Sequence, residues 1–224
     1  MYACLAEGST ILAEKAIVCN SEDRQFAASL IIPTLSNLLS EAGWSKSDLK
    51  AIVVGIGPGS FTGIRIAVVT ARTLCQALNL PLLGISEFEC YAFKQQIVEY
   101  PYAIALNAGK NQYYCAHLNQ GYPSALPSHN KTNNQVKWEM TYHYLNEQES
   151  HSHFADFKQV WKAPSANGTI NQAIDQALIA DFWLAEAKQL KQDLSEIFPY
   201  HIVKPLYIRN ASITISSLNK ARKI

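Results

Sequence analysis

The sequence lacks a long hydrophobic run and an excess of either charge. No apolar run reaches about 18 residues, so the sequence predicts no bilayer-spanning helix. The first residues show no basic segment followed by an apolar stretch, so we expect no secretory signal. The 19 Lys and Arg side chains balance 18 Asp and Glu, a net charge of +1, whereas proteins that bind nucleic acid unaided usually carry a basic excess. These absences argue against a membrane protein and against a protein that binds nucleic acid by itself.

Paired cysteines are also missing. The five cysteines, at positions 4, 19, 75, 90 and 115, form an odd set without CxxC spacing. Disulfide frameworks use even sets and structural zinc sites use close pairs. The pattern therefore predicts a reduced, cytoplasmic protein in which cysteine serves as a small buried apolar residue.

The sequence offers little for catalysis or metal binding. None of the six histidines stands four residues from another, and the close pair His151 and His153 lies in a polar stretch that we interpret as a solvated loop. Glu87 and Glu89 are two residues apart and do not make a convincing acid–base pair. We therefore expect no catalytic residue and no metal site.

What is present fits a globular α/β chain. Hydrophobic residues make up 48% of the 224 residues and charged residues 17%, enough for one large domain or two small ones. The unbroken apolar run 51–56 is typical of a strand buried on both faces. Pro33 should kink the first helix, and the polar stretch 119–165 predicts loops with short elements. The predicted strands lie within 2–18 and at 51–56, 82–85, 103–106 and 113–116, and the predicted helices at 21–42, 61–79, 87–98 and 170–194.

A glycine-rich segment links the buried strand to the next helix. Loops of this kind approach phosphates at helix N-termini, but the segment matches neither the P-loop, nor the dinucleotide GxGxxG pattern, nor the nucleophile elbow. A tight turn with close helix–strand packing explains its glycines at least as well. Its hydroxyls, on Ser60 and Thr62, have no identified base, so we expect them to cap the helix or donate to loop carbonyls.

The helix after this loop carries more apolar surface than one sheet can cover. At 100° per residue, its apolar side chains span about 200°, whereas a helix lying on one sheet needs a stripe only a little over 100° wide. The preceding helix is also broadly apolar. Either the two helices cover each other, or they form a docking surface for a partner.

The glycine-rich string resembles the hallmark of the bacterial TsaB (YeaZ) family. Supporting resemblances lie at 30–33, 82–86 and 204–209, and together they cover most of the first 118 residues and the C-terminal quarter. The resemblance implies an α/β, actin-like (ribonuclease-H-like) fold with two lobes, the second reduced. We expect an N-terminal lobe over 1–105 and a C-terminal lobe over 106–224, with the polar insert at about 119–165. The string consists of Gly57, Pro58, Gly59, Ser60, Phe61, Thr62, Gly63, Ile64 and Arg65.

The resemblance also implies a function. Members of this family are non-catalytic subunits of the complex that adds threonylcarbamoyl to adenosine 37 of tRNAs reading ANN codons. They dock the TsaD transferase subunit through their first two helices, and a TsaE ATPase subunit joins them. By the same resemblance, tRNA binds only through the complex, and no cofactor is needed except ATP or ADP at the shared interface. The apolar helical face makes a homodimer of the chain alone the expectation when the partner is absent. The docking residues would be Ile32, Leu35, Leu39, Phe61, Ile64, Val68, Val69 and Leu74.

Two departures qualify the resemblance. Family members begin with a central strand ending in Asp-Thr-Ser, which nothing here matches, so we expect an incomplete N-terminus and two exposed hydrogen-bonding edges. The hairpin at 107–111 also lacks the carboxylate often found there. The alternative is an independent nucleotide-binding enzyme of the actin/sugar-kinase type, which needs phosphate loops in both lobes. A dinucleotide-binding module is a third, weaker hypothesis.

Overall fold

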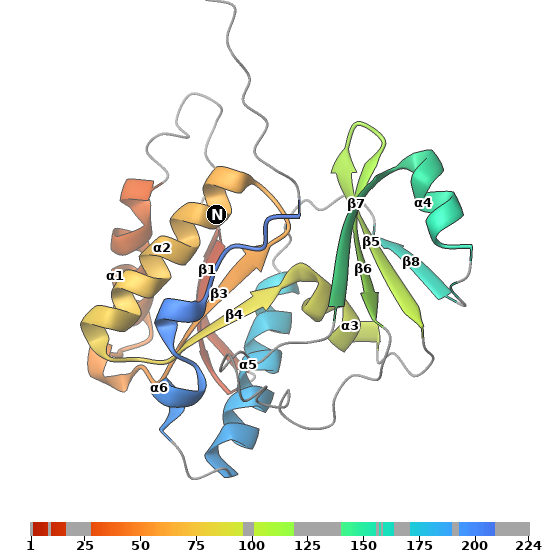
Figure 1. Ribbon diagram of the computed structural model, residues 1–224. Helices are drawn as coiled ribbons and strands as arrows, with labels where there is room; N and C mark the ends of the chain where they lie inside the picture. Colours follow the sequence, from red (N-terminus) through yellow and green to blue (C-terminus); the bar gives the residue numbers. More distant parts are fainter. Residues whose placement is uncertain are drawn as a thin grey trace, which may run out of the picture.

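The computed structural model describes residues 2–8, 10–16, 28–95, 101–118, 140–155, 157, 159–163, 171–189 and 193–208 (Figure 1). None of the helices in these ranges is both long and apolar enough to cross a membrane. The strands are β1 Tyr2–Glu7, β2 Thr10–Ala16, β3 Ile52–Gly57, β4 Leu82–Ser86, β5 Tyr102–Gly109, β6 Gln112–Leu118, β7 Met140–Asn146 and β8 Gln159–Ala163. The α-helices are α1 Ile31–Glu41, α2 Phe61–Leu78, α3 Glu87–Gln95, α4 Glu147–His153, α5 Asn171–Gln189 and α6 Leu194–Ile197. Short 3-10 helices cover Lys46–Asp48 and Tyr200–Ile202.

The first lobe comprises β1 to β4 with α1 and α2. β1 and β2 form an antiparallel pair, and β3, which the unbroken apolar run predicted as a strand, forms a parallel pair with β4. Among the described residues, no strand joins β1 to β3, so each pair is a separate sheet. Helices α1 and α2 lie on one side of these strands and α5 contacts β1 and β3 from the other (Figure 1).

The second lobe is a four-stranded sheet in the order β7-β6-β5-β8, with α4 beside it. Side chains alternate across β5, because successive residues of a strand point to opposite faces. Tyr102, Ile104 and Leu106 face the core that α3 completes through Phe88. The intervening alanines face a second core, which includes Phe154 from the turn that ends α4. The sheet is therefore covered on both faces.

Helices α3, α5 and α6 tie the two lobes together. Phe88 of α3 belongs to the core of the second sheet, whereas Cys90 packs toward β4. Helices α5 and α6 lie within 106–224, yet they pack against β4 and α3 through Ile179 and Ile197. The lobe boundary near residue 105 remains a prediction. The C-terminal helices α5 and α6 pack back against the first lobe.

One structural expectation needs correction. Pro33 does not sit inside a long helix, because α1 begins at Ile31 and its first turn leaves backbone N–H groups without helical partners in any case. The expected helix start near Ser21 falls outside the described residues. The polar stretch 119–165 contains short elements, as expected, and two of them, β7 and β8, are the edges of the second sheet. Their pairing with β6 and β5 compensates for the shortage of aliphatic residues there.

Candidate functional sites

The glycine-rich loop is shaped by close packing between β3 and α2. Gly57 has φ +104°, and a Cβ at this position would lie 2.7 Å from Cδ1 of Ile64. Ser60 caps α2, because its Oγ accepts a hydrogen bond from the backbone N–H of Gly63 at 3.3 Å. This confirms the capping role expected of the Ser60 hydroxyl. The geometry favours the packing interpretation of Gly57 over close approach to a phosphate.

The chain's own C-terminal segment lies against this loop. The backbone N–H of Leu206 donates to the carbonyl of Ile56 at 2.8 Å. Tyr207 stacks on Phe61, with ring centroids 4.6 Å apart. Part of the loop is therefore occupied from within the molecule, while Gly59, Ser60, Thr62, Gly63 and Arg65 remain exposed and Gly57 and Pro58 are buried.

One carboxylate lies beside the loop, at the start of α3. A Cβ on Gly59 would lie 4.0 Å from Oε1 of Glu87, whose Oε2 is buried without a hydrogen-bond partner. Burial raises the pKa of Glu87 to about 7. Glu89 is used differently: the backbone N–H of Ser86 donates to its Oε2, and its own N–H donates to Oγ of Ser86 at 3.1 Å. Glu87 and Glu89 thus do not form a catalytic pair.

The residues expected to dock a partner divide into three groups. Ile32 is 49% exposed, Val69 is 56% exposed and Phe61 is 39% exposed. Leu35, Leu39, Ile64 and Leu74 are half-buried, and Ile64 packs into the core below α2. Val68 is only 1% exposed and belongs to that core, so its assignment to a docking surface is wrong. The expectation also missed Leu30, which precedes α1 and is 42% exposed.

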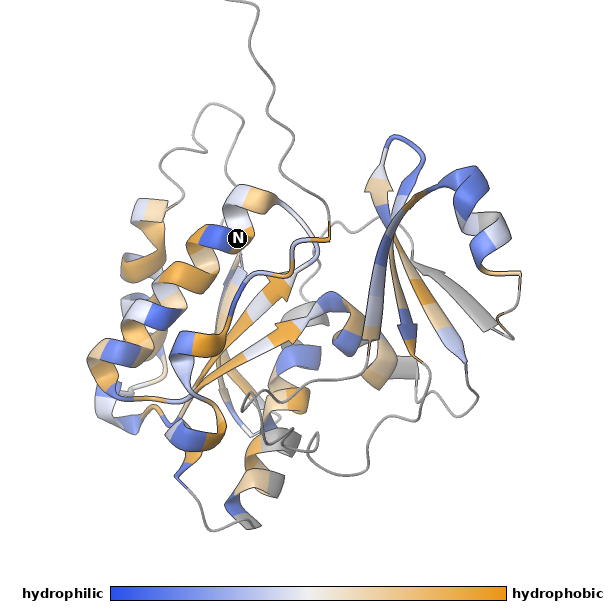
Figure 2. Ribbon diagram, viewed as in Figure 1, coloured by the Kyte–Doolittle hydropathy of each residue, from blue (hydrophilic) through white to orange (hydrophobic). Residues whose placement is uncertain are grey.

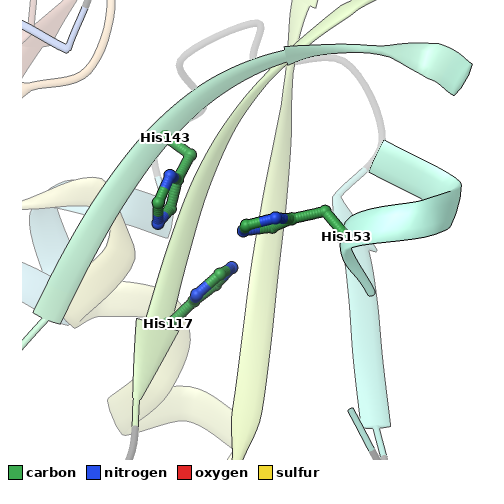
Figure 3. A group of neighbouring side chains, drawn as sticks. All are labelled: His117, His143 and His153. Atoms are coloured by element: carbon green, nitrogen blue, oxygen red, sulfur yellow. The ribbon is translucent and has the colours of Figure 1, made fainter. Parts of the chain in front are cut away.

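A second candidate site lies in the second lobe, where His117, His143 and His153 meet (Figure 3). Nitrogen atoms of the three imidazoles all lie within 4.8 Å of one another. The Nε2 atoms of His117 and His153 are buried and have no hydrogen-bond partner. Burial, reinforced by the neighbouring His143 and His153, lowers the pKa of His117 to about 4, and burial also lowers the pKa of His143.

Strand register explains why these histidines converge. Cys115 of β6 pairs with His143 of β7, and His117 is two residues beyond Cys115, so both histidines point to the same face of the sheet. α4 lies beside β6 and β7, and its last residue, His153, completes the group. We expected only a solvated pair at His151 and His153. The structure instead joins His153 to two strands, a grouping that no spacing in the sequence reveals.

Comparison with known proteins shows which families this chain resembles. A model of the TsaD family, tRNA N6-adenosine threonylcarbamoyltransferase, matches residues 23–130. The tRNA threonylcarbamoyladenosine biosynthesis protein TsaB of Bacillus subtilis (strain 168) is 41% identical over 61 residues, 27% of each chain. TsaB of Escherichia coli (strain K12) is 41% identical over 56 residues, 25% of this chain and 24% of its own. Over these segments the chain is similar to proteins of the TsaB (YeaZ) family. The match spans about a quarter of the length of these curated TsaB proteins.

A solved structure extends the likeness to the whole fold. The crystal structure of an uncharacterized Pseudomonas aeruginosa protein, described as similar to the peptidase YeaZ, superposes with a TM-score of 0.53. The alignment covers 88% of this chain and 89% of that one, at 19% identity. At this identity the likeness bears on the fold alone. The fold is thus the actin-like α/β fold expected from the resemblance to TsaB.

Proposed function

We propose that the chain is a non-catalytic subunit of a complex that adds threonylcarbamoyl to adenosine 37 of tRNAs reading ANN codons. The kinship with TsaB biosynthesis proteins supports the pathway. The observation that carries the scaffold role is the exposure of large apolar side chains on α1, just before it, and on α2. Exposed apolar surface of this kind marks protein contacts rather than chemistry.

The partner that we propose is a TsaD-type transferase. The TsaD family model matches residues 23–130 of this chain, a range that contains α1 and α2. A related transferase would carry equivalent helices, so the two proteins can meet through similar surfaces, as two copies do in an isologous dimer. Ile32 and Val69, the most exposed of the large apolar side chains on α1 and α2, would contribute to this contact together with Leu30 and Phe61. A TsaE-like ATPase would join the pair, and tRNA would bind only to the assembled complex.

The polar groups near the loop support a binding role. Ser60 is engaged as the cap of α2, and Glu89 is engaged with Ser86, so neither is arranged as a nucleophile or base. Glu87 is a single buried carboxyl with no hydrogen bond to Oε2. Catalysis of acyl transfer needs a positioned set of groups, and the described residues of the loop do not make one.

The decisive test is co-purification with the TsaD-type transferase of the same organism. A double variant, Ile32→Glu and Val69→Glu, should lose the partner because it places two charges within an apolar contact. Leu12→Glu is the matched control, since Leu12 of β2 is 39% exposed but lies on neither helix. If the folded double variant retains the transferase as fully as the control does, the docking surface lies elsewhere.

An independent nucleotide-binding enzyme of the actin/sugar-kinase type is the alternative. The buried Glu87 carboxyl beside the glycine-rich loop is the observation in its favour. Calorimetry of the isolated chain with ATP and Mg²⁺ separates the two proposals. Micromolar binding to the chain alone would favour the enzyme, whereas binding only in the presence of the transferase would place ATP or ADP at the shared interface.

A further inference from the structure

The imidazole cluster of His117, His143 and His153 is built on three different elements. His117 lies on β6, His143 on β7, and His153 at the end of α4, and the three rings approach one another with centroids 4.6 to 4.7 Å apart. Figure 3 shows the rings converging on one point between the sheet and α4. All three therefore offer nitrogen atoms to a common centre.

Burial without hydrogen bonds is the second observation. Nε2 of His117 and Nε2 of His153 are shielded from water and have no partner. A buried polar atom without a partner is rare in native proteins and destabilises the fold. Two such atoms in one cluster indicate that a group binds between them.

The surroundings are apolar. Phe157 lies 4.5 Å from the ring of His117, and Phe154 lies 5.8 Å from the rings of both His117 and His153. These rings and the alanines of β5 belong to the core on this face of the sheet. An anion or a small polar molecule would find no charged side chain in this core cluster, whereas a metal ion needs only the imidazole nitrogens.

We infer that His117, His143 and His153 bind a divalent transition-metal ion, for which Zn²⁺ is the best match. Neutral imidazole is a preferred ligand of Zn²⁺, and three protein ligands leave a fourth tetrahedral position for water. Zn–N distances of about 2.0–2.1 Å place the nitrogens about 3.4 Å apart in a tetrahedron. The ligand nitrogens now lie within 4.8 Å of one another, and small rotations of the side chains would shorten these distances to the value that Zn²⁺ needs.

The ion would fasten α4 to the sheet. Two ligands come from adjacent strands and the third from the last residue of the helix, so the ion would link elements otherwise joined through packing and the short connection at Asn146. Metal binding to a folded site stabilises the fold by mass action. Hydrogen exchange in α4 should slow when the ion is bound.

The test is calorimetry of the metal-stripped full chain titrated with ZnCl₂. We expect one site per chain, and Co²⁺ in place of Zn²⁺ should give the visible absorption bands of a tetrahedral complex. His143→Ala and His153→Ala should each weaken binding at least about tenfold, because loss of even a group that only hydrogen-bonds a metal ligand has that effect, and these side chains would bind the ion directly. His201→Ala is the matched control, since His201 is exposed on the 3-10 helix Tyr200–Ile202 and should leave binding unchanged.

Two results would overturn the inference. A wild-type chain that shows no stoichiometric Zn²⁺ site has no such centre, whatever the variants do. A site that persists at full affinity in both His143→Ala and His153→Ala belongs to other histidines. Circular dichroism confirms that each variant is folded, and the wild-type titration remains decisive if one is not.

Discussion

The two lobes carry opposite kinds of mismatch between side chain and surroundings. Large apolar side chains are exposed in the first lobe, at Leu12, Leu30, Ile32, Phe61 and Val69. Among the described side chains of β5, β6, β7 and α4, no large apolar one is exposed to that extent, and polar imidazole nitrogens are buried instead. Figure 2 shows many apolar residues along α1 and α2, whereas α4 and the β5–β6 turn are mostly hydrophilic.

The exposed apolar surface of the first lobe and the buried imidazole nitrogens of the second each indicate a different kind of missing partner. Exposed apolar surface is relieved by another protein, because burial of that surface is favourable and needs no directional contact. A buried nitrogen lone pair is relieved only by a donor or a metal at a defined position. The first lobe therefore fits a docking module and the second an ion site, and the two can be disrupted independently.

The largest expected effect tests whether the loop of the first lobe is packed or open. Gly57→Ala should lower the free energy of unfolding by about 3–5 kcal/mol, because φ is +104° and the new Cβ would lie 2.7 Å from Cδ1 of Ile64. Urea denaturation measures the change. Gly59→Ala is the control, since its Cβ would meet Ile64 at an ordinary 3.5 Å. Equal, small losses in both variants would mean that the loop yields easily.

The next effect concerns the carboxyl between the lobes. The pKa of Glu87 is about 7 in the folded state against an ordinary 4.5, so the folded state binds more protons between these values. The free energy of unfolding should therefore fall as pH rises from about 4.5 to 7, by at most about 3 kcal/mol, and then level off. Glu87→Gln should remove this dependence and be the more stable protein at pH 8. Parallel pH profiles of variant and wild type would show that the carboxyl is not buried in this way.

Val68 and Val69 sharpen the contrast between core and surface within one helix. Val68→Ala should cost about 2 kcal/mol, because it removes buried carbon from the core below α2. Val69→Ala should change the free energy of unfolding by less than about 0.5 kcal/mol, because Val69 is 56% exposed. Thermal and urea unfolding of the free chain measure both. A large loss for Val69→Ala would show that this face is covered within the molecule and is unavailable for docking.

Local signals in the sequence predicted most of the first lobe. The apolar run became β3, and α2 ends where Asn79 adopts a left-handed backbone and caps the helix, two residues before Pro81. Such features depend on near neighbours, so sequence patterns reveal them. The helix arithmetic could not separate Val68 from Val69 in the docking set, because which apolar arc faces the sheet depends on how α2 is rotated over β3 and β4.

The second lobe shows the limit of local reasoning. β7 and β8 contain few aliphatic residues, and both join the sheet by pairing with β6 and β5. His117, His143 and His153 are far apart in the sequence, and only the register of β6 with β7 and the return of α4 bring them together. A ligand set made by tertiary contacts leaves no fixed spacing, unlike ligands carried on a single helix.

The smallest effect tests the second lobe directly, through a substitution that replaces an imidazole with an aromatic ring that has no nitrogen. In the presence of a chelator, His117→Phe should match or exceed the wild-type free energy of unfolding by at most about 1 kcal/mol, because it removes a buried, unpartnered nitrogen from an apolar core. With Zn²⁺ added, the order should reverse, since only the wild type can gain from the ion. A variant that is less stable than wild type under chelation would show that the imidazole of His117 stabilises the metal-free core. The buried nitrogen of the second lobe would then not indicate a missing partner, as the exposed apolar surface of the first lobe does.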